Sequence, residues 1–487
     1  MNIKKKSILS VIVLAILAFS TGASFVHAAG LPFQQSPPAL VNANTITVRG
    51  SSTVLPIAQA EGANFQNYWN NLVAANPSWG ASSFSQAPVL EGLGSGTAIP
   101  DLSIGTADVG EMSRPPNNAS NEWFDPNMVN MQIYAVGIDS VAIVASPDMT
   151  WLPQNLTTAQ VARLFVNTTA LPALSTWNDF FTYLGASTSG VPANALSEPI
   201  NRAVREPTSG TFDAFNNFFG NPNVSGGFLH KTGGIADGSQ NMATYTLCPE
   251  NIDIYNHVST GTTGAATDYI GFIALGYLQS YGNMIGENIA FNIKNPPAST
   301  QTFDASPTWG PFVAPTEPNV IWAFSGNQGA SATGQYWAWR YLWEVIPTLV
   351  PSTGTYLSVG VWVAYMRATN TTTAGNPVAV GTGSSDFVAD KNYIELSRAD
   401  IAGTIPIDGA LAPHGPLQGL LSTQSSAIPD GKVNFKDLTA FVQAYIAYFN
   451  LHIYNPYSDI DANGKINFND LSKYVTAYIA YFTLYIH

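Results

Sequence analysis

Arg205-Glu206-Pro207-Thr208-Ser209-Gly210-Thr211 is the stretch that decides the fold, and it runs directly into Phe212-Asp213-Ala214-Phe215. Phe212, Phe215 and Phe219 recur at helical spacing, and Ser or Thr just before such a run is typical of a helix N-cap. A helix start offers free backbone N–H groups, and an arginine can bind two oxygens at once. Alone, the stretch suits either an anion site or an ordinary cap beside a surface arginine.

Two similar strand–turn–helix units precede this stretch. In the first, residues 45–49 alternate like a strand, Gly50-Ser51-Ser52-Thr53 forms the turn, and residues 54–65 read as a helix. In the second, Gly94-Ser95-Gly96-Thr97 leads into a helix at 98–104. Turns after the strands of an open α/β sheet gather at one edge, where ligands bind. Neither turn is a Walker loop or a dinucleotide fingerprint.

The composition bounds the class of partner. Only 10% of the 487 residues are charged, well below the roughly 25% that is usual, and the formal net charge is −13. Because the chain is acidic, we expect no nucleic-acid partner. Basic residues are scarce before residue 290, yet Arg49 and Arg205 flank hydroxyl turns and Arg114 follows Ser113. This clustering favours an anion site built from local donors.

The N-terminus predicts export. Residues 1–29 read as a signal peptide, with Lys4–Lys6, the apolar run Ile8–Phe19 and a small-residue cleavage site; alternatively, Ser7–Ala29 stays as a membrane anchor. Residues 30–44 read as a linker. Glycosylation sequons fit an extracellular or cell-surface glycoprotein and begin at Asn118, Asn155, Asn167, Asn223 and Asn370.

Several other segments have readable patterns. Residues 156–165 predict a capped amphipathic helix, and both 336–346 and 357–367 read as helices with aromatic stripes. The apolar segment 132–145 is expected to carry the chain from one lobe to another, and a strand at 268–273 to return it. The lone Cys248 is expected to be buried and inert.

The last part of the chain contains an internal repeat of about 33 residues. In its second copy, Asp459, Asp461 and Asn463 precede Gly464, and Asp470 stands at loop position twelve. With the Lys465 carbonyl at position seven, alternate residues would direct oxygens inward, which predicts a Ca²⁺ site. The first copy has Ser426 and Ile428 at positions one and three, so we expect weak calcium binding or none there.

Residues 424–487 resemble a dockerin module, since paired loop–helix repeats carry Asp at position twelve. The resemblance implies a small α-helical, EF-hand-like module that folds around calcium and binds a cohesin-like partner. Intramolecular docking of this tail onto the upstream domains is the alternative.

The order of motifs upstream resembles the phosphate-binding proteins of phosphate ABC transporters. The shared motifs are the strand with a Gly/Ser/Thr turn, the Gly-Ser-Gly turn, the Ala-Asp-x-Gly segment, the Leu-Thr-x-x-Gln helix, the Arg-x-x-x-Ser-Gly-Thr loop and the Ile-Gly-Phe strand, within residues 45–280. The resemblance implies an α/β, two-lobe type II solute-binding fold closing at a hinge. We expect lobe 1 at 45–138, lobe 2 at 139–268, and a return to lobe 1 with an insertion at 269–415.

Carried over by position, the resemblance implies phosphate-binding residues in both lobes: Thr53, Ser95, Ser113, Arg205, Ser209, Gly210 and Thr211. Ser113 stands where the family often has an Asp that accepts the proton of hydrogen phosphate, so sulfate or another oxyanion is an alternative ligand. The implied function is phosphate capture for an ABC permease. A surface or scaffold protein that reuses the fold is a second hypothesis, and no cluster of residues predicts an enzyme.

Overall fold

The computed structural model describes residues 39–114, 131–167, 172–206, 209–219, 231–232, 235–236, 243–260, 268–292, 308–317, 319–320, 334–347, 350–367, 435–455, 458–459, 463–472 and 474–475. The predicted signal segment 1–29 lies outside these ranges, as do residues 426–434 of the first repeat loop and Asp461 of the second. Pro207 and Thr208 of the Arg205–Thr211 stretch also lie outside them.

A mixed nine-stranded sheet organises the described part of the chain. Its order is β2 (Val89–Glu91), β1 (Thr47–Gly50), β3 (Val109–Met112), β14 (Trp339–Pro347), β4 (Met131–Ala145), β10 (Tyr269–Ala274), β6 (Asn201–Arg205) and β9 (Thr246–Cys248), with β11 (Ile285–Gly286) also on β4. Strand β1 is parallel to β2 and β3, and β6 is parallel to β9 and β10. Parallel pairing places the turns after β1 and β3 at one edge.

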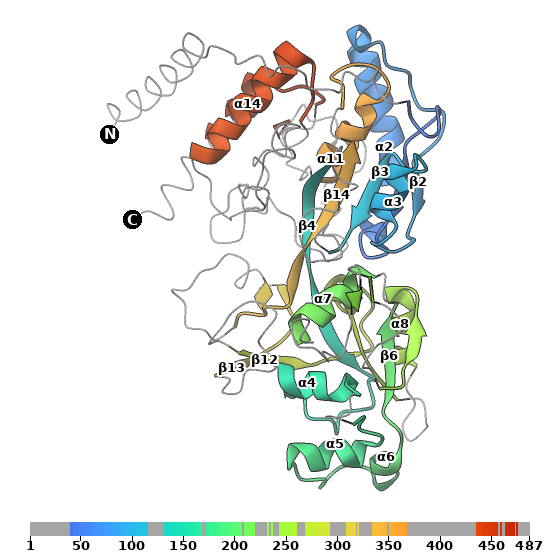
Figure 1. Cartoon of the computed structure of the whole chain (residues 1–487), viewed down its shortest axis with the longest axis vertical. Coiled ribbons are helices and arrows are strands. Elements are labelled where there is room, and N and C mark those ends of the chain that lie inside the picture. Colours follow the sequence, from blue (N-terminus) through green and yellow to red (C-terminus); the bar gives the residue numbers. More distant parts are fainter. Residues whose placement is uncertain are drawn as a thin grey trace, which may run out of the picture. The chain divides into compact units, whose positions relative to one another are not determined.

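Strand β4 is long and connects the two parts of this sheet (Figure 1). Residues 131–140 pair with β14, whereas residues 141–145 pair with β10. We call β2, β1, β3, β14 and the start of β4 the first half, and the end of β4 with β10, β6 and β9 the second half. The predicted apolar segment 132–145 is therefore one strand, and it passes between the halves. Strand β10 was expected to return the chain to the first lobe, but it lies in the second half. Strand β14 is the one that returns to the first half, where it pairs with β3.

The prediction of a helix at 336–346 is wrong. The segment forms β14, which pairs antiparallel with β3 on one side and β4 on the other. Most of its side chains are buried on both faces of the sheet. A strand of this kind reads as a continuous apolar run, which periodicity alone does not separate from a buried helix.

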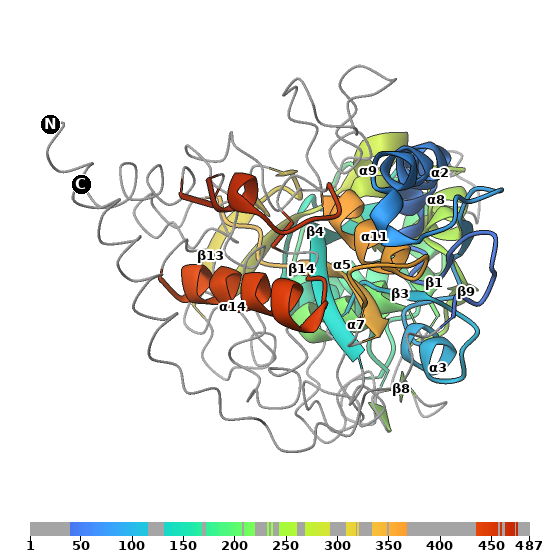
Figure 2. The same cartoon turned by 90° about the horizontal axis from the view of Figure 1, so that it is seen from above.

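Helices cover the first half. Helix α2 (Leu55–Ala75) follows the turn after β1, and α11 (Leu357–Arg367), at the bounds that the sequence predicts, packs beside it (Figure 2). Phe65 of α2 meets Trp362 of α11 edge to face, with ring centroids 5.0 Å apart. Helix α3 (Ala98–Ser103) follows the Gly94–Thr97 turn, and the short helix η1 (Pro77–Trp79) follows α2.

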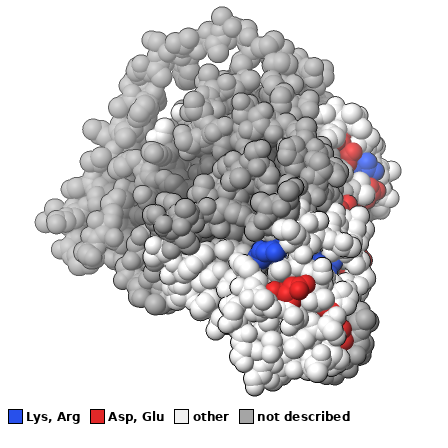
Figure 3. All heavy atoms as spheres, turned by 60° about the horizontal axis from the view of Figure 1, so that its bottom comes forward, with Lys and Arg blue, Asp and Glu red and all other residues white. Residues whose placement is uncertain are grey.

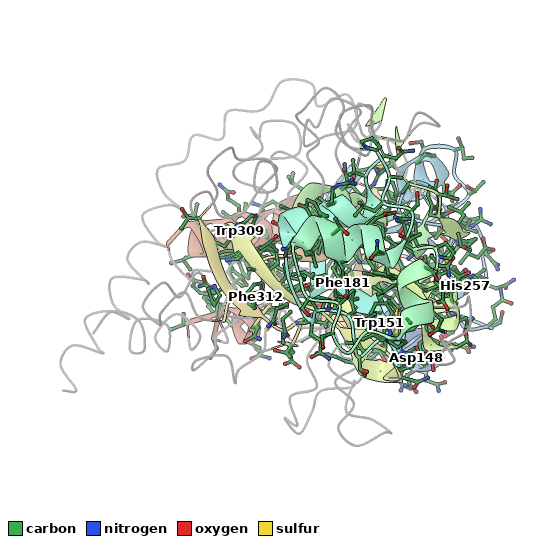
Figure 4. The ribbon with its side chains drawn as sticks, turned by 90° about the horizontal axis from the view of Figure 1, so that it is seen from below. Asp148, Trp151, Phe181, His257, Trp309 and Phe312 are labelled. Atoms are coloured by element: carbon green, nitrogen blue, oxygen red, sulfur yellow. The ribbon has the colours of Figure 1, made fainter. Side chains whose placement is uncertain are left out.

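The second half carries further helices: α4 (Thr158–Phe165), α5 (Trp177–Leu184), α6 (Ala193–Ser197), α7 (Gly210–Phe219), α8 (Asn251–Ser259) and α9 (Leu275–Tyr281). The Thr157 side chain caps α4 in a reciprocal capping box with Gln160, as the sequence predicts. Phe215 of α7 stacks on Phe272 of β10 at 3.9 Å, which holds the start of α7 against the sheet. Figure 4 shows Trp151 near Phe181 of α5, with ring centroids 6.2 Å apart.

Two small sheets complete the described strands. Strand β12 (Asn288–Asn292) pairs with β5 (Asn155–Thr157) and β13 (Trp309–Val313), and β7 (Lys231–Thr232) pairs with β8 (Ile235–Ala236). Charged side chains are sparse on the described surface in Figure 3, in keeping with the composition. Within the described ranges, no helix combines the length and hydropathy needed to cross a bilayer.

The C-terminal segment packs into the core of the first half. Helix α14 (Phe435–Leu451) contributes Phe441, and Tyr454 and Ile466 join the same buried cluster as Trp79 of η1. The backbone of this segment is tied to the loop before α11, because the Tyr454 N–H donates to the Val350 carbonyl at 3.0 Å. At Gly464 (φ +77°), a Cβ atom would overlap the Trp79 indole, so only glycine permits this approach.

Candidate anion site

Serine hydroxyls from three turns converge at the edge of the first half. Ser51 follows β1, Ser95 precedes α3 and Ser113 follows β3. Ser51 Oγ donates to Ser113 Oγ at 2.9 Å, and the Ser95 and Ser113 hydroxyls lie 3.1 Å apart. All three residues are buried, so their hydroxyls form a polar cluster inside the protein.

Arg205 enters the same region from the end of β6. Its side chain is fully buried; Nη2 donates to Ser52 Oγ at 2.9 Å and to the Pro249 carbonyl at 2.8 Å. Its Nη1 has no hydrogen-bond partner within the described residues. Burial lowers the pKa of Arg205 to about 10. A buried guanidinium with an unused N–H group is a donor for an anion.

The start of α7 brings the second half onto this serine cluster. Thr211 Oγ1 lies 3.0 Å from Thr53 Oγ1, and the Ser209 hydroxyl accepts the Thr211 N–H at 3.1 Å. A Cβ atom at Gly210 would overlap the Ser113 and Ser95 hydroxyls. The structure thus brings together all seven predicted residues, 158 positions apart in the case of Thr53 and Thr211.

Sequence reasoning missed two charged residues here, Arg340 of β14 and Asp139 of β4. Arg340 Nη2 donates to Asp139 Oδ2 at 2.7 Å and to Thr211 Oγ1 at 3.0 Å, and it lies 3.4 Å from Thr53 Oγ1. Burial raises the pKa of Asp139, while Arg340 opposes that rise. Charged residues inside two long apolar runs were the available signal, because buried charges require partners.

Asn251, at the start of α8, also supports the site, and sequence reasoning missed it too. Its side-chain N–H donates to Thr53 Oγ1 at 3.1 Å. The backbone N–H of Gly276, in α9, lies near Asp139 and opposes the rise in the Asp139 pKa that burial causes. Gly276 and Tyr277 line one wall of a cavity of about 370 Å³, and Pro56 and Gln59 of α2 line another. The cavity therefore adjoins the Arg340–Asp139 pair.

The predicted calcium loop is described in part. Asp459 accepts the backbone N–H groups of Asn463 and Gly464, at 3.0 and 2.6 Å, and Asp470 accepts that of Asn467 at 2.8 Å. Both carboxylates are buried. Within the described residues, from which Asp461 is missing, no three acidic, His or Cys side chains form a metal-binding group.

A family model described as "PBP superfamily domain" matches residues 36–348. Protein SphX of Synechocystis sp. is 27% identical over 171 residues, which are 35% of this chain and 43% of that protein, so the match spans less than half of the relative's length.

Two solved structures are among the similar ones. An ABC-type phosphate transport receptor from Vibrio cholerae has 15% identity and a TM-score of 0.39, covering 72% of this chain and 99% of that one. PstS from Borrelia burgdorferi has 15% identity and a TM-score of 0.34, covering 72% and 98%.

Proposed function

Because the chain belongs to the PBP superfamily, we propose that it is an exported solute-binding protein that captures inorganic phosphate between the two halves of its sheet. In this proposal it delivers phosphate to the permease of an ABC transporter. It binds its ligand without transforming it, so it is not an enzyme.

The observation that carries the proposal is the buried Arg205, which belongs to the second half and donates to the Ser52 hydroxyl of the first half. A tetrahedral oxyanion accepts several hydrogen bonds at once, and hydroxyls, helix-start N–H groups and a guanidinium are all donors. Thr53 and Thr211 now bond to each other. The halves would have to open at this contact to admit an anion, and after they close again each hydroxyl would bond to the anion instead.

Phosphate is the ligand that the motif order favours, and sulfate is the alternative. The resemblance leads us to expect a carboxylate at the position of Ser113. A serine hydroxyl is a weaker acceptor for the proton of hydrogen phosphate, so it discriminates less strongly against sulfate. Calorimetry with phosphate and sulfate under identical conditions ranks the two. Tighter binding of sulfate would replace phosphate as the proposed ligand.

The decisive experiment substitutes Arg205 and measures phosphate binding by calorimetry. We expect Arg205→Gln to weaken binding by at least about tenfold, since a charge-assisted hydrogen bond contributes roughly 1.5–3 kcal/mol. Arg163→Gln is the matched control, because it removes one positive charge from helix α4 and leaves the site intact. Unchanged affinity in Arg205→Gln would refute the site. A wild-type protein that binds no oxyanion would favour the surface-scaffold hypothesis.

We further propose that the loop at 459–470 binds Ca²⁺ and stabilises the packed C-terminal segment. Asp459, Asp461, Asn463, the Lys465 carbonyl and Asp470 would provide the oxygen ligands that this ion prefers. The two buried carboxylates and the turn at Gly464 support this assignment. A chelator should lower the melting temperature, and added calcium should restore it. An unchanged melting temperature would remove calcium from the proposal.

A further inference from the structure

Arg340 occupies a position that no turn motif marks. It lies on β14, the strand that pairs with both β3 and β4, so it belongs to neither hydroxyl turn nor to the start of α7. Even so, its Nη2 is within hydrogen-bonding distance of Thr53 from the first half and Thr211 from the second. It is the cation that contacts both of the hydroxyls that meet across the halves.

The side chain retains unused donor capacity. It is 5% exposed, and its Nη1 has no hydrogen-bond partner within the described residues. Arg205 is in the same state, with a buried Nη1 that no described atom accepts. Two buried guanidinium groups, each with an unsatisfied nitrogen, therefore face one polar cluster. Leaving such groups unsatisfied is costly unless a ligand accepts from them.

The electrostatics point the same way. Burial is the main cause of the lowered pKa of Arg205; Glu206 opposes this change and Arg340 adds to it, so the two cations lie close enough to repel each other. Asp139 compensates only Arg340, through Nε at 3.2 Å and Nη2 at 2.7 Å. The hydrogen-bond partners of Arg205 are the Ser52 hydroxyl and two backbone carbonyls, so an anion would give its guanidinium a charge-assisted hydrogen bond that no described residue provides.

We propose that Arg340 is a second arginine ligand of the bound oxyanion, and that Asp139 is its counter-ion, which competes with the anion for the guanidinium. This inference rests on the proposed function and deepens it. The bound anion would then accept hydrogen bonds from three parts of the fold: the serine turns, the Arg205 loop and strand β14. Anion binding would change the contacts of β14 directly, because Arg340 exchanges its hydroxyl contacts for contacts to the anion.

The test measures phosphate and sulfate affinity by calorimetry, and anion-induced shifts in melting temperature, for the full chain. Arg340→Gln removes one donor to the anion and should weaken binding by at least about tenfold. Asp139→Asn leaves the Arg340 charge without its carboxylate, so the anion becomes its main partner. We expect this variant to bind at least as tightly as wild type, with a larger anion-induced rise in melting temperature.

The opposite signs separate a ligand contact from a structural ion pair, for which both substitutions would merely destabilise the protein. If Arg340→Gln folds poorly, the double variant Asp139→Asn/Arg340→Gln replaces it, because it leaves no unpaired buried carboxylate. The double variant should show the same loss of affinity, about tenfold. Arg163→Gln serves again as the charge control. The inference is overturned if a folded Arg340→Gln or double variant binds within about twofold of wild type, or if Asp139→Asn loses as much affinity as Arg340→Gln. If wild type binds no oxyanion, the proposed function itself fails instead.

Discussion

Glu287 offers a direct test of how burial controls the stability of this protein. It follows β11 and is fully buried, and neither of its carboxyl oxygens has a hydrogen-bond partner within the described residues. Its backbone N–H donates to the Ile143 carbonyl of β4 at 2.9 Å, which fixes the residue inside the second half. Burial raises the pKa of Glu287 from 4.5 to about 8.

The sign of the pH dependence follows from this shift. Between pH 4.5 and 8, the folded state retains the Glu287 proton and the unfolded state has lost it. Raising the pH across this window therefore favours unfolding by about 1.4 kcal/mol per pH unit. At pH 7 the loss from this one group amounts to roughly 3 kcal/mol, a large part of a typical folding free energy. Buried Glu111 acts in the same direction, because burial raises its pKa also.

Glu287→Gln keeps the shape of the neutral acid and cannot ionise. Urea unfolding followed by tryptophan fluorescence at pH 4, 5, 6, 7 and 8 gives the stability of both proteins. We expect the slope of stability against pH to be shallower in the variant by about 1.4 kcal/mol per pH unit. Any constant cost of burying an amide changes the offset but not this slope. At pH 4 both side chains are neutral, so that point is the internal control. Equal slopes in the two proteins would refute the reasoning.

Three further substitutions test packing and capping. Gly210→Ala places a methyl group against Ser113, so it should hold the two halves apart and weaken phosphate binding in calorimetry, whereas unchanged affinity would show that this contact is absent from the bound state. Gly464→Ala meets Trp79 and has an unfavourable φ, so it should lower the free energy of unfolding by roughly 1–3 kcal/mol and speed proteolysis of the C-terminal segment; wild-type resistance would count against the packing. Thr157→Ala removes the α4 cap and should cost about 1 kcal/mol in urea unfolding, and no change would mean that the capping box adds nothing.

Local chemistry allowed several features to be predicted from the sequence. Helix α11 and the capping box of α4 follow from spacing and cap residues within a few positions of each other. The hydroxyl turns follow from short runs after predicted strands, and Arg205 stands at the end of one such strand. These features depend on neighbours in the chain, so their residue types alone carry the information.

The pairing of β14 and the Arg340–Asp139 contact were decided only by the tertiary structure. Arg340 and Asp139 are 201 residues apart, and nothing near either of them in the chain signals the other. The aromatic run of β14 suits a helix as well as a strand until β3 and β4 pair with its two edges and its side chains are buried on both faces of the sheet. The sequence by itself determined which residues can donate to an anion. Long-range burial and strand pairing decided which of those donors meet, because a buried charge is stable only where the fold brings it a partner.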